Sequence, residues 1–246
     1  EIPQTDVKVK LTIIQSKYYK VGDLYVVNGE PLGLVYEISD GGAHGKVVAL
    51  KAHRDLNLLY RTGLPYDEIH PEDPNNVGVI ARSETDGQEN MKAYKQIPDW
   101  KTHYPVAAYV SDLNDENGNP GWYLPAIKEV QAMVGWIDGE VLSPDGEAGQ
   151  EPSEAMKEKR KAINQLIVDN GGNEFYFYGY DVSFIIDQTN AWEADYFNRI
   201  YTSTETDYQV HPMVFKFYLR NGWWETMHVY GDLAGSYGEV RPFLAF

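Results

Sequence analysis

The segments Tyr25-Val26-Val27 and Gly33-Leu34-Val35-Tyr36-Glu37-Ile38 flank the dipeptide Asn28-Gly29. Both segments are rich in β-branched and aromatic residues, which favour strands. Asn-Gly accommodates the two positive φ angles that a tight hairpin turn requires, so we predict a β-hairpin here. Lys46-Val47-Val48-Ala49-Leu50 follows the turn residues at 40–45 and predicts a third strand. The first fifty residues are therefore expected to form a β-meander.

The rest of the chain is predicted to combine helices with further strands. A helix is expected over residues 126–134, directly after Leu124-Pro125. Another begins at its N-cap Ser153, runs to about Asp169 and ends at Gly171-Gly172. Strands are expected over 214–219, 223–230 and 240–246, and loops over 111–121 and most of 60–105, with a short helical patch near 90–96.

The composition limits the kinds of partner. The chain has 246 residues and a formal net charge of −16 at pH 7. A surface this acidic repels nucleic acid, anionic membranes and sulfated glycans, whereas it tolerates neutral sugars, cations and basic partners. We therefore expect no nucleic-acid partner, and the charge is compatible with a neutral glycan or a protein as the ligand.

The chain has no cysteine, which excludes disulfides, thiolate metal sites and a cysteine nucleophile. No stretch approaches the roughly 18 apolar residues of a membrane-spanning helix. Glu1 opens the chain without a signal peptide. We expect an export signal or lipid anchor, where the protein has one, to lie upstream of Glu1.

The N-terminal region differs in pattern from the remainder of the chain. Val7-Lys8-Val9-Lys10-Leu11-Thr12-Ile13 alternates between apolar and polar residues, as a half-buried strand does. We predict a separate strand or linker over residues 1–16. Residues 17–246 are predicted to form one domain, because no composition shift marks a linker within them.

Several short motifs occur in an order that resembles one bacterial family. They are Asp86-Gly87-Gln88-Glu89-Asn90, Tyr104-Pro105-Val106-Ala107-Ala108, Trp122-Tyr123-Leu124-Pro125-Ala126, Tyr201-Thr202-Ser203-Thr204-Glu205 and Val240-Arg241-Pro242-Phe243-Leu244-Ala245-Phe246. Over about residues 18–246 the chain resembles the C-terminal domain of a collagen-like bacterial adhesin, the Lcl C-terminal family. Many members of that family are surface proteins of gut bacteria.

The resemblance implies an α+β domain of C-type-lectin-like fold, with antiparallel sheets, two main helices and long loops. It also implies that the two chain ends meet in one antiparallel sheet. The pattern is similar, more distantly, to formylglycine-generating enzymes and sulfatase-modifying factors. Those enzymes need active-site cysteines, and this chain has none, so their chemistry is excluded here. Tyr201-Thr202-Ser203-Thr204 also lacks the family's usual tryptophan, so a ligand site at that motif does not carry over.

Glu129 and Arg241 are the two charged residues that the resemblance places in the interior. Glu129 lies on the helix after Leu124-Pro125, and Arg241 lies in the final strand. We predict that they form a partly buried ion pair that ties the helix to the closing sheet. Breaking such a pair often costs about 3–5 kcal/mol.

Asp112, Asn114 and Glu116 lie in an acidic stretch that has the residue types of a calcium loop. Calcium takes six to eight oxygen ligands from a flexible, carboxylate-rich turn. The glycine at 118 comes one position late for an EF-hand, and no glutamate follows at the required distance. The alternative is a solvated turn, and Ca²⁺ is the only cofactor that we consider.

A group of aromatic and acidic residues in the C-terminal third has the composition of a sugar-binding surface. Sugar sites combine an aromatic face for C–H patches with carboxylates for hydroxyls. The candidate ligand-binding residues are Trp192, Glu193, Asp195, Tyr196, Tyr208 and Trp224. The alternative is that these aromatic side chains fill the core or pack at a sheet edge.

The sequence gives no basis for assigning catalytic residues. The six histidines do not occur at a metal-ligand spacing such as His-x-x-x-His. Serines lack the surroundings of a nucleophile elbow, and with 37 acidic residues, chance pairs of carboxylates are expected. We therefore predict a non-enzymatic binding or adhesion domain at the bacterial outer surface. The alternative is a structural subunit of a surface or fimbrial assembly, and a glycoside hydrolase ranks last.

Overall fold

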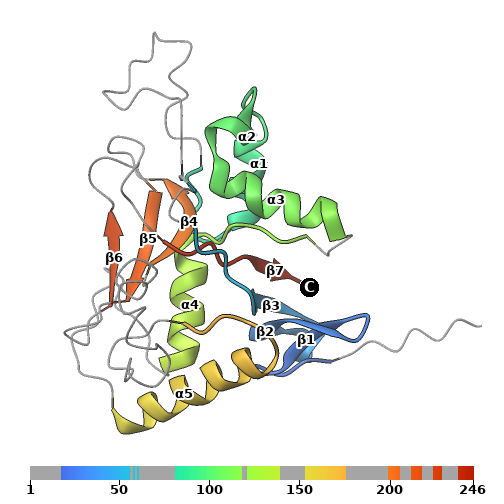
Figure 1. Cartoon of the computed structure of the whole chain (residues 1–246), viewed down its shortest axis with the longest axis vertical. Coiled ribbons are helices and arrows are strands. Elements are labelled where there is room, and N and C mark those ends of the chain that lie inside the picture. Colours follow the sequence, from blue (N-terminus) through green and yellow to red (C-terminus); the bar gives the residue numbers. More distant parts are fainter. Residues whose placement is uncertain are drawn as a thin grey trace, which may run out of the picture.

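The computed structural model describes residues 18–55, 58, 60, 81–117, 121–138, 153–175, 199–205, 212–217, 224–228 and 238–246. Within them the chain forms two sheets and a set of helices (Figure 1). The strand orders are β1-β2-β3-β7 in one sheet and β4-β5-β6 in the other. All strand pairs are antiparallel, so the fold belongs to the α+β class, as predicted.

The first sheet opens with the predicted hairpin, formed by β1 (Leu24–Val27) and β2 (Glu30–Ser39). Asn28 and Gly29 have φ angles of 53° and 86°, and Val27 pairs with Glu30 across them. Two adjacent positive φ angles in a two-residue loop are those of a type I′ turn, whose twist matches that of the strands. The turn chemistry of the sequence therefore determines the hairpin.

The short 3-10 helix η1 (Asp40–Gly42) connects β2 to β3 (His44–Ala49), and β7 (Phe243–Ala245) lies beside β3. Val47 pairs with Leu244, so the end of the chain closes the sheet that its beginning opens. The prediction that the opening meander and the final strand share one sheet is confirmed. The regular strand is shorter than the predicted 240–246.

The second sheet contains β4 (Arg199–Glu205), β5 (Pro212–Phe217) and β6 (Trp224–His228). Strands β5 and β6 lie within or close to the predicted strands at 214–219 and 223–230. Strand β4 lies at one end of the strand order β4-β5-β6, and its residues after Arg199 are buried. The predicted strand Val7–Ile13 and the proposed N-terminal segment 1–16 lie outside the described residues.

Three helices occupy the region between the sheets in the sequence: α1 (Gly87–Tyr94), α2 (Trp100–His103) and α3 (Pro105–Asn117). Helix α1 covers most of the predicted helical patch. Helix α3 corrects the prediction of a loop beginning at 111. Its residues Val106 and Val110 are fully buried, because a spacing of four places both on one helix face.

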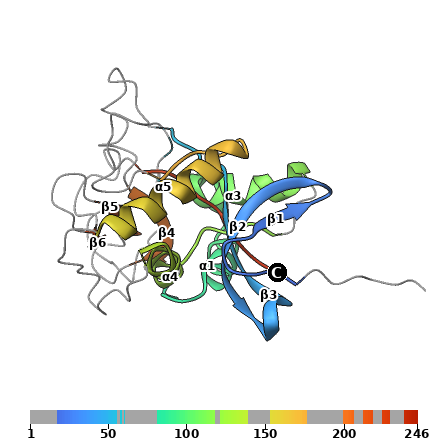
Figure 2. The ribbon, with the colours of Figure 1, turned by 90° about the horizontal axis from the view of Figure 1, so that it is seen from below.

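The two helices predicted after Leu124-Pro125 and after Ser153 form α4 (Ile127–Asp138) and α5 (Glu154–Asp169). The Ser153 hydroxyl accepts a hydrogen bond from the Met156 amide, which confirms the predicted N-cap. Helix α4 ends at Asp138, beyond the predicted end at residue 134. It contacts strands of both sheets, so it lies between them (Figures 1 and 2).

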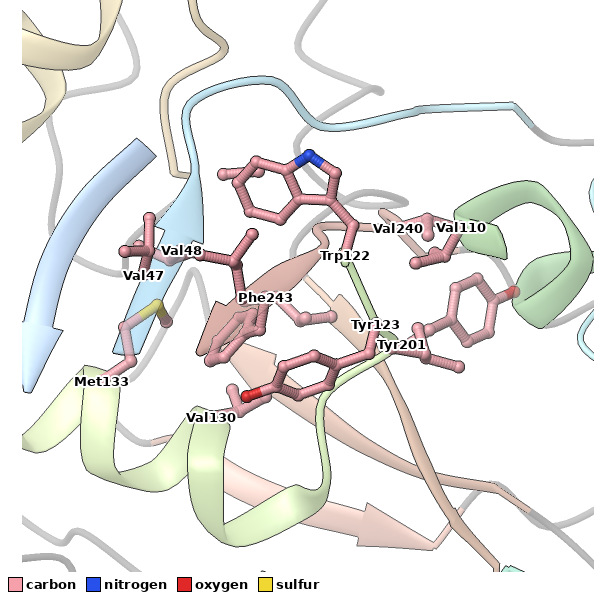
Figure 3. Close-up of a cluster of buried hydrophobic side chains, with 14 of the residues drawn as sticks. Val47, Val48, Val110, Trp122, Tyr123, Val130, Met133, Tyr201, Val240 and Phe243 are labelled. Carbon is pink, nitrogen blue, oxygen red and sulfur yellow. The ribbon is translucent and has the colours of Figure 1, made fainter. Parts of the chain in front are cut away.

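The C-terminal segment joins the two sheets. Glu239 bridges Ile200 of β4 in parallel, Val240 bridges His53, and Phe243 bridges Tyr123. Phe243 and Tyr123 exchange both main-chain hydrogen bonds, at 2.9 and 2.8 Å. Figure 3 shows the rings of Phe243 and Tyr123 packed among Val130 and Met133 of α4. The core is therefore continuous from one sheet to the other.

A buried polar network holds α1 against β4. The Asn90 amide donates to the Ser203 hydroxyl at 3.0 Å and to the Ser83 carbonyl at 2.7 Å. The Tyr94 hydroxyl donates to the Ser203 carbonyl at 2.6 Å, and the Thr204 hydroxyl donates to the Ser83 carbonyl at 2.9 Å. Burial is tolerated because these polar groups find partners.

The buried tyrosines predict loss of stability at alkaline pH. Burial raises the pKa of Tyr94 well above its usual value, and it raises the pKa of Tyr201 to about 12. A raised native pKa favours the native state below the unfolded value of about 10, and this advantage is lost as the pH rises through the native value. We expect the free energy of unfolding to fall above about pH 10 by up to about 1.4 kcal/mol per pH unit for each buried tyrosine.

Urea denaturation between about pH 9 and about pH 11 measures this slope. Tyr94→Phe is expected to make the slope shallower by about one tyrosine. Tyr18→Phe is the control, because the Tyr18 side chain is 64% exposed and its substitution should leave the slope unchanged. Equal slopes in the two variants would show that Tyr94 ionises within the folded protein.

Candidate functional site

Glu129 lies where the N-termini of α1 and α4 meet. Its Oε2 accepts hydrogen bonds from the Gly87 amide at 3.0 Å and the Ala126 amide at 2.9 Å. Its Oε1 accepts from the Tyr123 hydroxyl at 2.8 Å and pairs with the Lys46 ammonium at 3.0 Å. One buried carboxylate therefore caps two helices, whose N-terminal amides and dipoles both favour a negative charge.

Arg241 lies near the start of the C-terminal segment 238–246, and its side chain is fully buried. Its Nε donates to Glu239 Oε1 at 2.7 Å, and its Nη1 donates to the carbonyls of Ala49 and Leu50, both at 3.1 Å. Its Nη2 donates to the Asn173 carbonyl at 2.8 Å. The guanidinium thus ties together the end of β3, the segment after α5 and the final segment of the chain. Burial lowers its pKa, an effect that the neighbouring Glu239 opposes.

The predicted ion pair between Glu129 and Arg241 is wrong. Both residues are buried, but Glu129 pairs with Lys46, whereas Arg241 pairs with Glu239. Arg54 donates to the second oxygen of Glu239 at 3.0 Å, so this carboxylate lies between two guanidinium groups. The physical reason is positional, because Glu239 is two residues from Arg241 and enters the core with it. Glu129 and Arg241 each join segments that are far apart in the sequence.

The predicted calcium loop is helical where the structure describes it. Asp112, Asn114 and Glu116 belong to α3, whereas a calcium site of this kind takes its ligands from a flexible turn. The Asn114 side chain instead accepts from the Trp122 amide at 2.6 Å and donates to the Trp122 carbonyl at 2.8 Å, and Asp112 pairs with Lys101. Among the described residues, no group of three histidine or acidic side chains could hold a metal ion.

The predicted sugar-binding residues fall largely beyond the described ranges. Trp192, Glu193, Asp195, Tyr196 and Tyr208 all lie outside the described residues. Trp224 begins β6, but its side chain is also outside what is described. Their role as ligand-binding residues stays a prediction.

A hollow of about 340 Å³ is the candidate site that the described residues provide. It lies between the tip of the β1–β2 hairpin, the end of β3, α3 and the segment before α4. We call it the Trp122 hollow; it is lined by Val27, Asn28, Glu30, Pro31, Leu32, Leu50, Lys51, Leu113 and Trp122. Its size falls at the lower end of the range of small-molecule sites.

Trp122 places an indole at the hollow. The side chain is only 7% exposed, and Asn114 fixes its main chain through two hydrogen bonds. Figure 3 shows the indole nitrogen on the side of the ring that is turned away from Phe243 and Tyr123. Among the described residues, no acceptor binds this nitrogen. Trp122 therefore lines the hollow and carries a hydrogen-bond donor on the side of its ring that is turned away from the core.

Strand β1 forms an outer edge of the first sheet and adjoins the hollow through Val27. Within the described part of the chain, β1 pairs only with β2. Two of the exposed large apolar side chains, Tyr18 and Val21, precede this strand, at 64% and 40% exposure. The hairpin therefore carries apolar surface at its base and the hollow at its tip.

The residues of the hollow were not predicted as a site. The hairpin, Lys51 and Leu113 are far apart in the sequence, and none of them has a motif of its own. Trp122 was noted only as part of the motif Trp122–Ala126. In the sequence, nothing about a tryptophan shortly before a helix start indicates a binding surface. In the structure, Gly121 has a φ of 102° directly before Trp122.

Comparison with known proteins provides one structural likeness. No protein-family model and no curated protein matches this sequence. The fold is similar to the crystal structure of a fimbrial protein from Bacteroides ovatus, with a TM-score of 0.51 and 15% sequence identity over 93% of this chain. This chain spans about half of that protein, 49% of its length. At this identity the likeness concerns the fold alone.

Among the described residues, no helix combines the length and the apolar character needed to cross a membrane.

Proposed function

We propose that this chain is a subunit of a bacterial surface or fimbrial assembly, in which it binds neighbouring molecules and catalyses no reaction. The observation that carries the proposal is the likeness in fold to the fimbrial protein, which extends over 93% of the chain. Because this chain spans only half of that protein, the proposal concerns a module and not the whole assembly.

The edge of the first sheet is the surface that we assign to subunit contacts. Exposed strand edges offer unpaired main-chain groups to another chain. Strand β1 has only four residues and a bulge between Tyr25 and Val26, so it can form few main-chain hydrogen bonds. Side-chain contacts around Tyr18 and Val21 must therefore supply much of the binding energy.

The absence of cysteine from the chain permits a direct test of surface location. Lys92 is exposed on α1, so Lys92→Cys introduces one accessible thiol. We expect a membrane-impermeant maleimide to label this variant on intact cells of the source organism. Val110→Cys is the matched control, because Val110 is fully buried and should stay unlabelled until the protein is denatured.

Assembly is tested on the same cells. Mechanical shearing is expected to release the chain in high-molecular-weight material that contains the surface fibres. Labelling of Lys92→Cys only after lysis would refute the surface location. Labelling on intact cells with a purely monomeric sheared fraction would refute the assembly.

The adhesive role is the finer form of this proposal. In it, a neutral glycan or a protein ligand is bound by Trp192, Glu193, Asp195, Tyr196, Tyr208 and Trp224. The net charge of −16 supports a neutral over a sulfated glycan. Binding to a glycan array that Trp192→Ala abolishes would be the expected result, and an array without hits would remove the glycan from the proposal.

We also propose that the domain is C-type-lectin-like and related to the Lcl C-terminal family. The pairing of β3 with β7 supports this, because the family is thought to bring both chain ends into one sheet. The helix that follows Leu124-Pro125 supports it as well. An experimental structure of an Lcl family member tests this assignment, and a different strand order there would exclude it.

A further inference from the structure

The Trp122 hollow combines an apolar wall with four kinds of polar group. Val27, Pro31, Leu32, Leu50 and Leu113 supply the apolar wall, while Asn28, Glu30, Lys51 and the Trp122 indole supply the polar groups. Asn28, Glu30 and Lys51 are exposed, whereas Leu50 and Trp122 are buried. The hollow is therefore apolar at its base and polar at its rim.

The polar groups are free to bind something else. The segment Leu50-Lys51 lies beside β2, because the Leu50 amide donates a hydrogen bond to the Leu32 carbonyl. Even so, Glu30 and Lys51 form no ion pair among the described residues. The Trp122 indole nitrogen likewise has no acceptor there. The nitrogen is not one of the fully buried polar atoms that lack a partner, so solvent reaches it and a ligand acceptor can replace that water.

The apolar wall distinguishes between classes of ligand. A saccharide needs polar partners for its hydroxyls and an open aromatic face for its C–H patches. Trp122 is 7% exposed, so its face is covered, and the rest of the wall is aliphatic. Burying hydroxyl groups against aliphatic side chains without hydrogen bonds is unfavourable. An aliphatic or aromatic amino-acid side chain matches the wall better.

We propose that the Trp122 hollow binds a peptide segment that carries one large apolar side chain next to a carboxylate. The apolar side chain enters the hollow against Leu32, Leu50 and Leu113. A peptide carbonyl accepts the hydrogen bond of the Trp122 indole, and the carboxylate pairs with Lys51. This inference goes beyond the proposed function, because it concerns the purified chain and holds whether or not the protein joins an assembly.

Titration of the purified chain with N-acetyl-leucine tests the proposal. The probe contains an isobutyl side chain, an amide carbonyl and a carboxylate. The chain has six tryptophans, so a protein labelled with nitrogen-15 on tryptophan gives one indole signal for each, and Trp122→Phe identifies the signal of Trp122. We expect that signal to shift and saturate, with a Kd of about 1–10 mM for so small a ligand.

Three comparisons separate the contributions. N-acetyl-alanine is expected to bind about tenfold more weakly, because it lacks most of the apolar side chain. Lys51→Gln should weaken binding of N-acetyl-leucine but not of its amide, which has no carboxylate. Leu113→Lys should abolish the shift by filling the hollow, and unchanged signals from the other tryptophans would confirm that this variant is folded.

The contrary outcomes are equally defined. An indole signal of Trp122 that no probe moves would overturn the proposal. A saturating shift with maltose in place of N-acetyl-leucine would overturn it in favour of a saccharide. A shift that persists in Leu113→Lys would place the binding elsewhere. None of these results depends on surface labelling or shearing of cells, so the proposed function and this inference can fail separately.

Discussion

Replacing Arg241 with methionine is expected to lower the free energy of unfolding by about 3–5 kcal/mol. Methionine keeps an unbranched apolar side chain, which can still lie against the Phe175 ring that the guanidinium now covers at 4.0 Å. It supplies none of the donors that satisfy Glu239, Ala49, Leu50 and Asn173. Glu239 would keep Arg54 and the Leu50 carbonyl would keep the Asn173 amide, but each acceptor would lose one buried hydrogen bond. A lost buried hydrogen bond to a charged group costs more than the loss of an exposed contact.

Urea denaturation at neutral pH measures this change. Lys128→Gln is the matched control, since it also removes one cation from an ion pair, that of Lys128 with Glu84 at 2.7 Å. The side chains of that pair are 53% and 50% exposed, so its loss should cost less than about 1 kcal/mol. A similar small loss for Arg241→Met would mean that the Arg241 cluster contributes no more than a surface pair.

Replacing Glu129 with glutamine is expected to lower the free energy of unfolding by about 3 kcal/mol. The substitution preserves shape, but the amide group of glutamine replaces one of two acceptor oxygens. Two of the four donors, which come from Gly87, Ala126, Tyr123 and Lys46, would then lose their acceptor. The charge that both helix N-termini favour would also be lost.

Thermal unfolding monitored by circular dichroism and urea denaturation both measure the effect of Glu129→Gln. Glu154→Gln is the control, because Glu154 lies in the first turn of α5, is exposed and pairs with Lys157 three residues away. We expect that control to change stability by about 0.5 kcal/mol or less. Equal effects at the two positions would contradict the assignment of Glu129 as the cap of two helices.

Combining Glu129→Gln with Arg241→Met in one protein tests whether these two residues are partners of each other. Because Glu129 and Arg241 have different partners, their effects should add to within about 0.5 kcal/mol. If the two residues were direct partners, the double variant would lose less stability than the sum of the single variants. The second substitution would then remove a charge whose partner the first substitution had already removed. Arg241→Met combined with Glu239→Gln should show such coupling and serves as the positive comparison.

Local sequence signals were sufficient where neighbouring residues decide the conformation. Asn28-Gly29 accommodates two positive φ angles, and this defined the β1–β2 hairpin and the positions of its strands. Ser153 capped α5 as predicted, because a serine hydroxyl reaches the amide three residues on. Both features depend on hydrogen bonds within a few residues.

Helix α3 shows where this reasoning failed. The stretch after Ser111 is rich in Asp and Asn, which are typical of turns, and it was predicted to be a loop. The spacing of Val106, Val110 and Leu113 was a helical signal that the acidic residues outweighed. Burial of Val106 and Val110 against the core stabilises the helix, so tertiary packing overrides a weak local preference.

The sequence by itself determined the β1–β2 hairpin and the N-cap of α5 at Ser153. The α+β class, the inward position of Glu129 and Arg241 and the return of the final segment to the opening sheet followed from the family resemblance. Only the tertiary structure decided that Glu129 meets Lys46 and two helix N-termini, and that Arg241 meets Glu239. It alone brought Trp122, Leu113 and the hairpin tip around one hollow. The physical reason is that ion pairs and hollows form between segments distant along the chain, whereas propensity, periodicity and capping act within a few residues.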